Sequence, residues 1–132
     1  MSKLMVGQSA SMSKVITEED IESYAKVSGD YNPIHMDEAA AEKSPFGGRI
    51  AHGMLSAGLI SAVLGTKMPG EGTVYLGQNL KFLLPVRIGD EITATCEVIE
   101  VKNEEKGIYR LKTVCTNQNG EMVIDGEAVI KY

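Results

Sequence analysis

The chain has 132 residues, of which 43% are hydrophobic and 23% are charged, and its formal net charge is -5 at pH 7. This length and composition are typical of one globular domain, which we expect to span residues 1–132. The acidic balance argues against nucleic acid as a partner, because binding to a phosphate backbone needs a basic surface.

At the N-terminus, residues 1–14 lack the continuous apolar segment of a secretory signal. The longest uncharged apolar stretch, residues 51–65, is too short and too rich in Gly and Ser to span a bilayer. We therefore expect a cytoplasmic protein without a membrane partner. Residues 9–16 form the first predicted strand.

Three helices are predicted next. Thr17 is a typical N-cap and Gly29 a typical stop, which predicts a helix over 17–29. Asp37 can cap a brief helix over 37–43. The longest predicted helix, over 51–68, has a length of about 27 Å. Its apolar residues cover much of its circumference, which indicates a central, buried helix; they are Met54, Leu55, Leu59, Ile60, Val63 and Leu64.

The rest of the chain after Gly72 reads as strands, which we expect to pair as one antiparallel meander. A slip in the alternation at Val98–Ile99 predicts a bulge, and Asn119-Gly120 predicts a two-residue hairpin turn. In the first of these strands, Leu76, Leu80 and Phe82 should share one face. The predicted fold class is α+β, with a curved antiparallel sheet wrapped around the long helix. The predicted strands cover 73–83, 91–101, 107–118 and 121–132.

The chain has two cysteines, Cys96 and Cys115, both in predicted strands. They form no C-x-x-C pattern and no cluster with histidine, so we expect no metal site. We expect the thiols to be reduced and to pack as small apolar side chains.

Two segments carry candidate chemistry. In "SGDYNPIH", residues 28–35, Asp30 and His35 are the side-chain types most used to move protons. Pro33 stiffens the turn between them, so both side chains can reach one point in space. In "GGRIAHGMLS", a glycine-rich loop leads into the long helix, whose first N–H groups, particularly that of Gly53, lack helical partners. Such a helix start favours an oxyanion or a phosphate.

The segments "YAKVSGDYNPIH" and "GGRIAHGMLSAGLIS" resemble the MaoC-like (R)-specific enoyl-CoA hydratases and 3-hydroxyacyl dehydratases, which are single-domain hot-dog proteins. The resemblance covers nearly the whole chain. It implies a hot-dog fold, a homodimer that joins two sheets or a higher homo-oligomer, an acyl-CoA ligand and no cofactor. It also implies that Asp30 and His35 are the catalytic pair, that Gly53 supplies an oxyanion N–H, and that Ser61 and Asn32 support the pair.

The implied reaction is the reversible addition of water to a trans-2-enoyl-CoA, which gives an (R)-3-hydroxyacyl-CoA. It needs a base for water, an acid for Cα and donors for the enolate-like oxygen. Asp30 and His35 can hold one water, and either residue can be the first base. Hot-dog thioesterases resemble one another in carrying an acid on or beside the central helix, and residues 51–68 contain none. This absence argues against hydrolysis, which stays the alternative activity, and non-catalytic binding of acyl-CoA is a third interpretation.

The phosphates of coenzyme A call for local cations on this acidic chain. Arg49, Lys81 and Arg87 are the candidates, and Lys43 and Lys67 are weaker ones. An acyl carrier protein, which is acidic, would need the same basic patch, so charge does not separate the two carriers. His52, beside the helix start, fits a packing or capping role better than a ligand contact.

Overall fold

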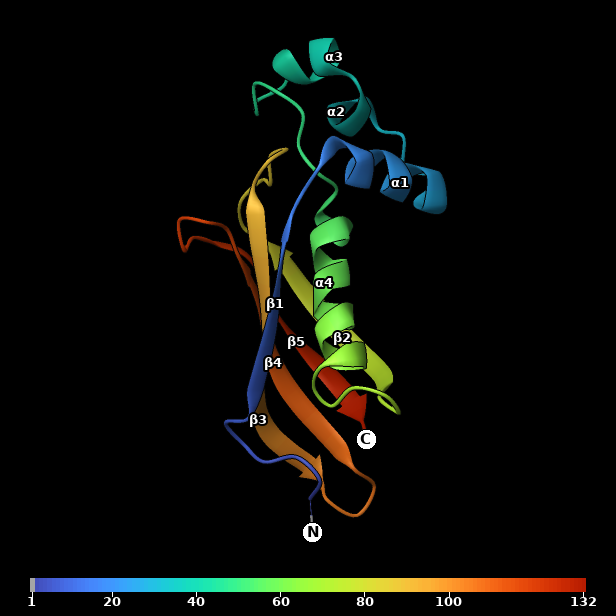
Figure 1. The fold of residues 1–132 in the computed structure, drawn as a ribbon, viewed down its shortest axis with the longest axis vertical. Helices are drawn as coiled ribbons and strands as arrows, with labels where there is room; N and C mark the ends of the chain where they lie inside the picture. The colour runs from blue at the N-terminus through green and yellow to red at the C-terminus, as the bar shows by residue number, and fades with distance from the viewer. Residues whose placement is uncertain (1) are drawn as a thin grey trace.

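The computed structural model describes residues 2–132 as one sheet, one long helix and a group of short helices. The long helix α4 runs along one face of the sheet, and helices α1 to α3 gather beyond one end of it (Figure 1). The elements are β1 (Ser9–Val15), α1 (Glu18–Ser28), α2 (Pro33–Met36), α3 (Glu38–Glu42), α4 (Gly53–Thr66), β2 (Val74–Phe82), β3 (Glu91–Asn103), β4 (Ile108–Thr116) and β5 (Met122–Lys131).

All five strands belong to one antiparallel sheet with the order β1-β3-β4-β5-β2. Only β3, β4 and β5 form a meander, so the prediction of one continuous meander is wrong for β2. The reason is that β1 occupies the free edge of β3, from Ser9↔Glu97 to Val15↔Glu91. The remaining open edge belongs to β5, and β2 pairs there. The sheet and α4 enclose the apolar core, which confirms the predicted α+β class.

Two predicted irregularities have different outcomes. The bulge at Val98–Ile99 is confirmed, because the β3–β4 register shifts between Val98 and Glu100. The β4–β5 loop is not a two-residue turn. Asn117 N–H donates to Glu121 O at 2.9 Å, and Gly120 has φ 76°, whereas Asn119 does not take a positive φ. A two-residue type I′ turn needs positive φ at both central positions, so the chain forms a longer loop with glycine in the left-handed region.

A third irregularity lies in β2, where the pairing with β5 shifts between Tyr75 and Gly77. Leu80 packs against the core, and Leu76 is the extra residue at the shift. The face that Leu76, Leu80 and Phe82 were expected to share is therefore interrupted at Leu76.

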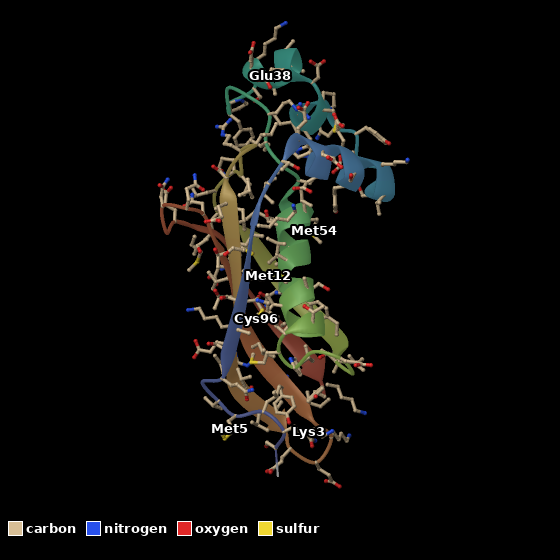
Figure 2. All side chains as sticks on the ribbon, in the orientation of Figure 1. Lys3, Met5, Met12, Glu38, Met54 and Cys96 are labelled. Atoms are coloured by element: carbon tan, nitrogen blue, oxygen red, sulfur yellow. The ribbon has the colours of Figure 1, made fainter. Side chains whose placement is uncertain are left out.

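The long helix starts at Gly53 and ends at Thr66, two residues inside each predicted boundary. It starts late because Ala51 N–H donates to Val86 O at 2.8 Å and His52 is extended, with ψ 132°. One face is buried against the sheet. The helix is central, as predicted, but not all of its apolar residues are buried within the single chain: Met54, near the start of α4 (Figure 2), is 51% exposed. The exposed stripe is Met54, Gly58, Ser61 and Gly65.

The short helices follow local signals. Thr17 and Asp20 form a reciprocal capping box at the start of α1, and Gly29 ends it with φ 82°, which confirms that prediction. Asp37 caps α3, as predicted. Between them the structure has a helical turn, α2, in the segment that we expected to be a loop. Asn32 is its N-cap, with Oδ1 accepting from Ile34 N–H at 3.2 Å.

Cys96 and Cys115 are unpaired thiols buried on the sheet face that α4 covers, which confirms the predicted packing. Burial raises the pKa of Cys96 to about 12, and the neighbouring Cys115 thiol adds to that shift. Burial alone raises the pKa of Cys115 to about 12. Among residues 2–132, no helix is both long and apolar enough to cross a membrane.

Candidate active site

His35 sits on α2 and is 9% exposed. Its ring nitrogen Nδ1 lies 2.8 Å from Ile50 O. Because a carbonyl oxygen only accepts, Nδ1 carries the proton and donates it. Nε2 is thereby left as the acceptor of the neutral ring, and this nitrogen is available to a substrate or a water. Asn32 contributes by capping α2, which places His35 on that helical turn.

Asp30 follows the left-handed Gly29 that ends α1, and its side chain is exposed. Its Oδ1 accepts from Asn32 N–H at 3.2 Å. Oxygen or nitrogen atoms of Asp30, His35 and His52 lie within 4.8 Å of one another. The structure therefore brings the two predicted catalytic residues together, and it adds His52, for which the sequence favours a packing or capping role.

His52 directly precedes α4 and is 2% exposed. It makes no side-chain capping bond. Its Nε2–H donates instead to the main-chain carbonyl of Asp30 at 2.9 Å. Its ring centroid lies 3.9 Å from that of His35, with 31° between the ring planes. In the sequence, the position of His52 beside the glycine-rich helix start is the one feature that could have indicated its contact with His35.

A carboxylate and two imidazoles at this spacing are also a donor set for a metal ion. In the described residues, however, His35 Nδ1 and His52 Nε2 each donate to a carbonyl oxygen. These two hydrogen bonds leave each ring one further nitrogen, whereas a zinc site needs several donor atoms about 2 Å from a single point. The geometry fits acid–base chemistry better.

A cavity of about 350 Å³ opens beside His35, with Gly53 on its wall. Gly53 is the first residue of α4, and its N–H has no acceptor among residues 2–132. This N–H and the positive end of the helix favour a partly negative oxygen in the cavity. The remaining walls are mostly apolar and suit an acyl chain; they include Phe46, Ile50, Met54, Phe82, Leu83, Leu84, Val86, Val123 and Ile124.

Two serines of α4 line different pockets. Ser56 lines the cavity with Gly53 and is fully buried, and its hydroxyl has no partner in the described part of the chain. Sequence reasoning missed it. Ser61 lies about 12 Å along the helix axis from Gly53. It lines a separate pocket with Tyr24 and Tyr75, so the structure does not bring it beside His35. Burial, with the Cys96 thiol nearby, raises the pKa of Tyr75 to about 12.

The three main candidate cations have different surroundings. Arg49 is held internally, because its Nε donates to His35 O at 2.6 Å and its Nη1 pairs with Glu18 at 2.8 Å. Lys81 lies with Lys112 and Asp125 in a pocket that neither His35 nor Gly53 lines.

Arg87 directly follows Val86 of the cavity wall, and its guanidinium lies beside Gly48. Arg87 is therefore the one of these three that lies beside the cavity, and it forms no ion pair within residues 2–132.

The two weaker candidates lie elsewhere. Lys43 caps the C-terminus of α3 and is exposed. Lys67 donates through Nζ to Ser11 O at 2.9 Å, beyond the opposite end of α4 from Gly53.

Residues 5–119 match the family model of the MaoC like domain. The chain is 52% identical over 124 residues to an (R)-specific enoyl-CoA hydratase of Rhodospirillum rubrum, covering 94% of this chain and 85% of that protein. It is 48% identical over 129 residues to a 3-hydroxybutyryl-CoA dehydratase of Methylorubrum extorquens, covering 97% and 80%. A solved structure, an (R)-hydratase from A. caviae involved in PHA biosynthesis, has a TM-score of 0.94 at 44% identity and covers 99% of this chain and 98% of that one.

The chain therefore belongs to the MaoC-like domain family, and its sheet and long helix are a hot-dog fold. The resemblance of residues 24–35 and 47–61 to this family is confirmed.

Proposed function

We propose that this protein is a hydro-lyase that adds water to a trans-2-enoyl-CoA and forms an (R)-3-hydroxyacyl-CoA, in a reversible reaction. The observation that carries the proposal is the pairing of Asp30 with His35 next to a cavity whose wall presents the free Gly53 N–H. The hydratase and dehydratase relatives support it.

Each part of the site has one task. Water lies between the Asp30 carboxylate and Nε2 of His35, and one of these groups takes its proton as the oxygen bonds to Cβ of the substrate. The C=C π electrons move toward the thioester, whose oxygen accepts from Gly53 N–H. A proton from the pair then reaches Cα. Acid–base catalysis of this kind contributes roughly 10²–10⁴ in rate, and one oxyanion donor contributes about 2.7–4 kcal/mol.

The cavity gives the acyl group an apolar environment, and Arg87 is the proposed contact for a phosphate at its edge. The carrier is coenzyme A, with an acyl carrier protein as the alternative. Residues 1–132 are taken as a single domain, and a cytoplasmic location stays a prediction from the sequence.

We also propose a two-fold homodimer. β2 is an edge strand with three exposed apolar residues in a row, namely Val74, Tyr75 and Leu76, with exposed fractions of 50%, 40% and 51%. The other edge strand, β1, is rich in serine. An exposed apolar edge invites pairing with another copy, so the β2 edge is the proposed contact.

The test is a spectroscopic assay with crotonyl-CoA. We expect the wild-type protein to remove the enoyl absorbance without releasing thiol and to form the (R)-product, identified by chiral chromatography. Asp30→Asn and His35→Ala should each lower kcat by roughly 10²–10⁴, and the double variant should lose little more than the worse single variant. Glu22→Gln, which changes an exposed carboxylate of α1, is the matched control and should keep full activity.

Other outcomes separate the alternatives. Release of free thiol would identify a thioesterase, and binding without either reaction would identify an acyl-CoA-binding protein. Near-normal turnover in folded Asp30→Asn would remove Asp30 from the mechanism.

A further inference from the structure

The ring of His52 contacts both members of the proposed catalytic pair through different atoms. Its Nε2–H donates to the carbonyl of Asp30, and its face stacks on the ring of His35. We infer that His52 is a positioning residue, which fixes Asp30 and His35 relative to each other. This inference rests on the proposed function in assigning a catalytic purpose to that pair.

The hydrogen bond matters because the turn that carries Asp30 has few other anchors. Within this turn, Asp30 N–H donates to Ser28 Oγ at 3.1 Å and Asn32 N–H donates to Asp30 Oδ1 at 3.2 Å. Both are contacts between near neighbours in an exposed segment. Among the described residues, His52 makes the one hydrogen bond that ties residues 29–32 to a distant part of the chain. Its position at the start of α4 connects the turn to the core helix.

The stacked ring restrains His35 from a second direction. The bond from Nδ1 to Ile50 O acts in the plane of the His35 ring, whereas His52 covers one face of that ring. His52 is itself held, because the Tyr24 ring of α1 lies 4.7 Å away on centroids. The result is one preferred orientation of the ring of His35, a residue that lines the cavity.

His52 does not line the cavity and is 2% exposed. It therefore does not touch substrate, and its effect must pass through Asp30 and His35. A positioning role predicts a loss in kcat with little change in KM, since substrate contacts remain.

Two variants separate the hydrogen bond from the stacking. His52→Gln keeps an N–H donor for Asp30 O and removes the ring, while His52→Phe keeps a ring and removes the donor. We expect His52→Phe to lower kcat for crotonyl-CoA by about tenfold, which equals about 1.4 kcal/mol. KM should change less than about twofold, and His52→Gln should recover part of the lost rate.

A double-variant cycle tests whether the effect passes through Asp30. In an Asp30→Asn background, His52→Phe should lower the remaining rate by less than about twofold, because the group it positions no longer reacts. A full tenfold loss in that background would show that His52 only packs the core and would overturn the inference.

Amide hydrogen exchange over residues 28–36 gives a readout without turnover. We expect this segment to exchange about tenfold faster in folded His52→Phe than in the wild type, and less so in His52→Gln. If the wild type hydrates crotonyl-CoA but both variants keep its kcat and its exchange, the inference fails and the proposed function stands. If the wild type is inactive while exchange changes as expected, the proposed function fails and the positioning of the turn stands.

Discussion

Gly53 combines two properties at the start of α4. Its N–H has no acceptor among residues 2–132, and its missing side chain leaves room for Phe82. A Cβ at this position would lie 2.6 Å from two carbons of the Phe82 ring. Any other residue type at position 53 would therefore displace the Phe82 ring in this wall of the cavity. Some substitutions would keep the main-chain N–H and others would change it. The steric effect has to be separated from the donor effect before either is measured.

A Phe82→Ala background makes that separation possible, because it removes the ring that a Cβ would meet. In this background Gly53→Ala adds a methyl group and keeps the N–H, whereas Gly53→Pro removes the N–H, at a helix position where proline is tolerated. We expect kcat of the proline variant to be roughly 10²–10³ lower than that of the alanine variant. Both variants need matching circular dichroism spectra.

Equal kcat values in the two variants would place the oxyanion donor elsewhere. In the protein that retains Phe82, Gly53→Ala alone should already lower activity, because the Phe82 ring has to move.

At the scale of elements, the pairing of β2 with β5 depends on Gly126. A Cβ at Gly126 would collide with the main-chain carbonyl of Asn79 on β2. This close approach lets Gln78 cross over Gly126 and donate to the buried Thr113 hydroxyl at 2.8 Å. The edge strand is thus joined to β4 by a side chain as well as to β5 by its backbone.

Gly126→Ala should consequently lower the free energy of unfolding by about 1–3 kcal/mol, because main-chain atoms cannot move aside as a flexible side chain can. Gly48→Ala is the control, since a Cβ at Gly48 would approach no atom closer than 3.5 Å, which is ordinary van der Waals contact. Urea unfolding followed by circular dichroism measures both. A stability loss below about 0.5 kcal/mol in Gly126→Ala would mean that β2 shifts its register freely.

The ends of α1 were predictable from sequence because their causes are local, whereas both ends of α4 were displaced by two residues. Thr17, Asp20 and Gly29 act within single turns of α1, so the residue types alone defined that helix. The position of β2 was not predictable in this way, because it depends on β1 occupying the far edge of β3. Asp30 and His35 were found through turn chemistry and the family resemblance. The role of His52 was missed because it needs a contact between residues 22 positions apart.

At the scale of the whole molecule, one patch of exposed apolar surface lies on β2 and beside the start of α4. Leu76 on β2 and Met54 on α4 are each 51% exposed. Both line one pocket with Ser61, which the single chain leaves away from His35. A second copy seated on this surface would cover the apolar residues and surround Ser61, which suits the proposed dimer.

Sedimentation at micromolar concentration should show a dimer of the wild-type protein. Leu76→Arg should shift it toward the monomer, because a charge on the β2 edge opposes burial. Met5→Arg is the control, since Met5 is 71% exposed and lies near the opposite end of the molecule from the short helices (Figure 2). A fully active wild-type monomer would contradict the proposed dimer.

The two buried cysteines determine how cleanly hydration can be told from hydrolysis. Their pKa values of about 12 keep Cys96 and Cys115 protonated at neutral pH, and burial shields both sulfurs. Disulfide reagents react with thiolates, so they should leave the native protein unlabelled. A colorimetric reagent added during turnover then has one source of signal, which is coenzyme thiol freed from the thioester. The protein's own thiols should therefore add little background to the assay that distinguishes hydration from hydrolysis.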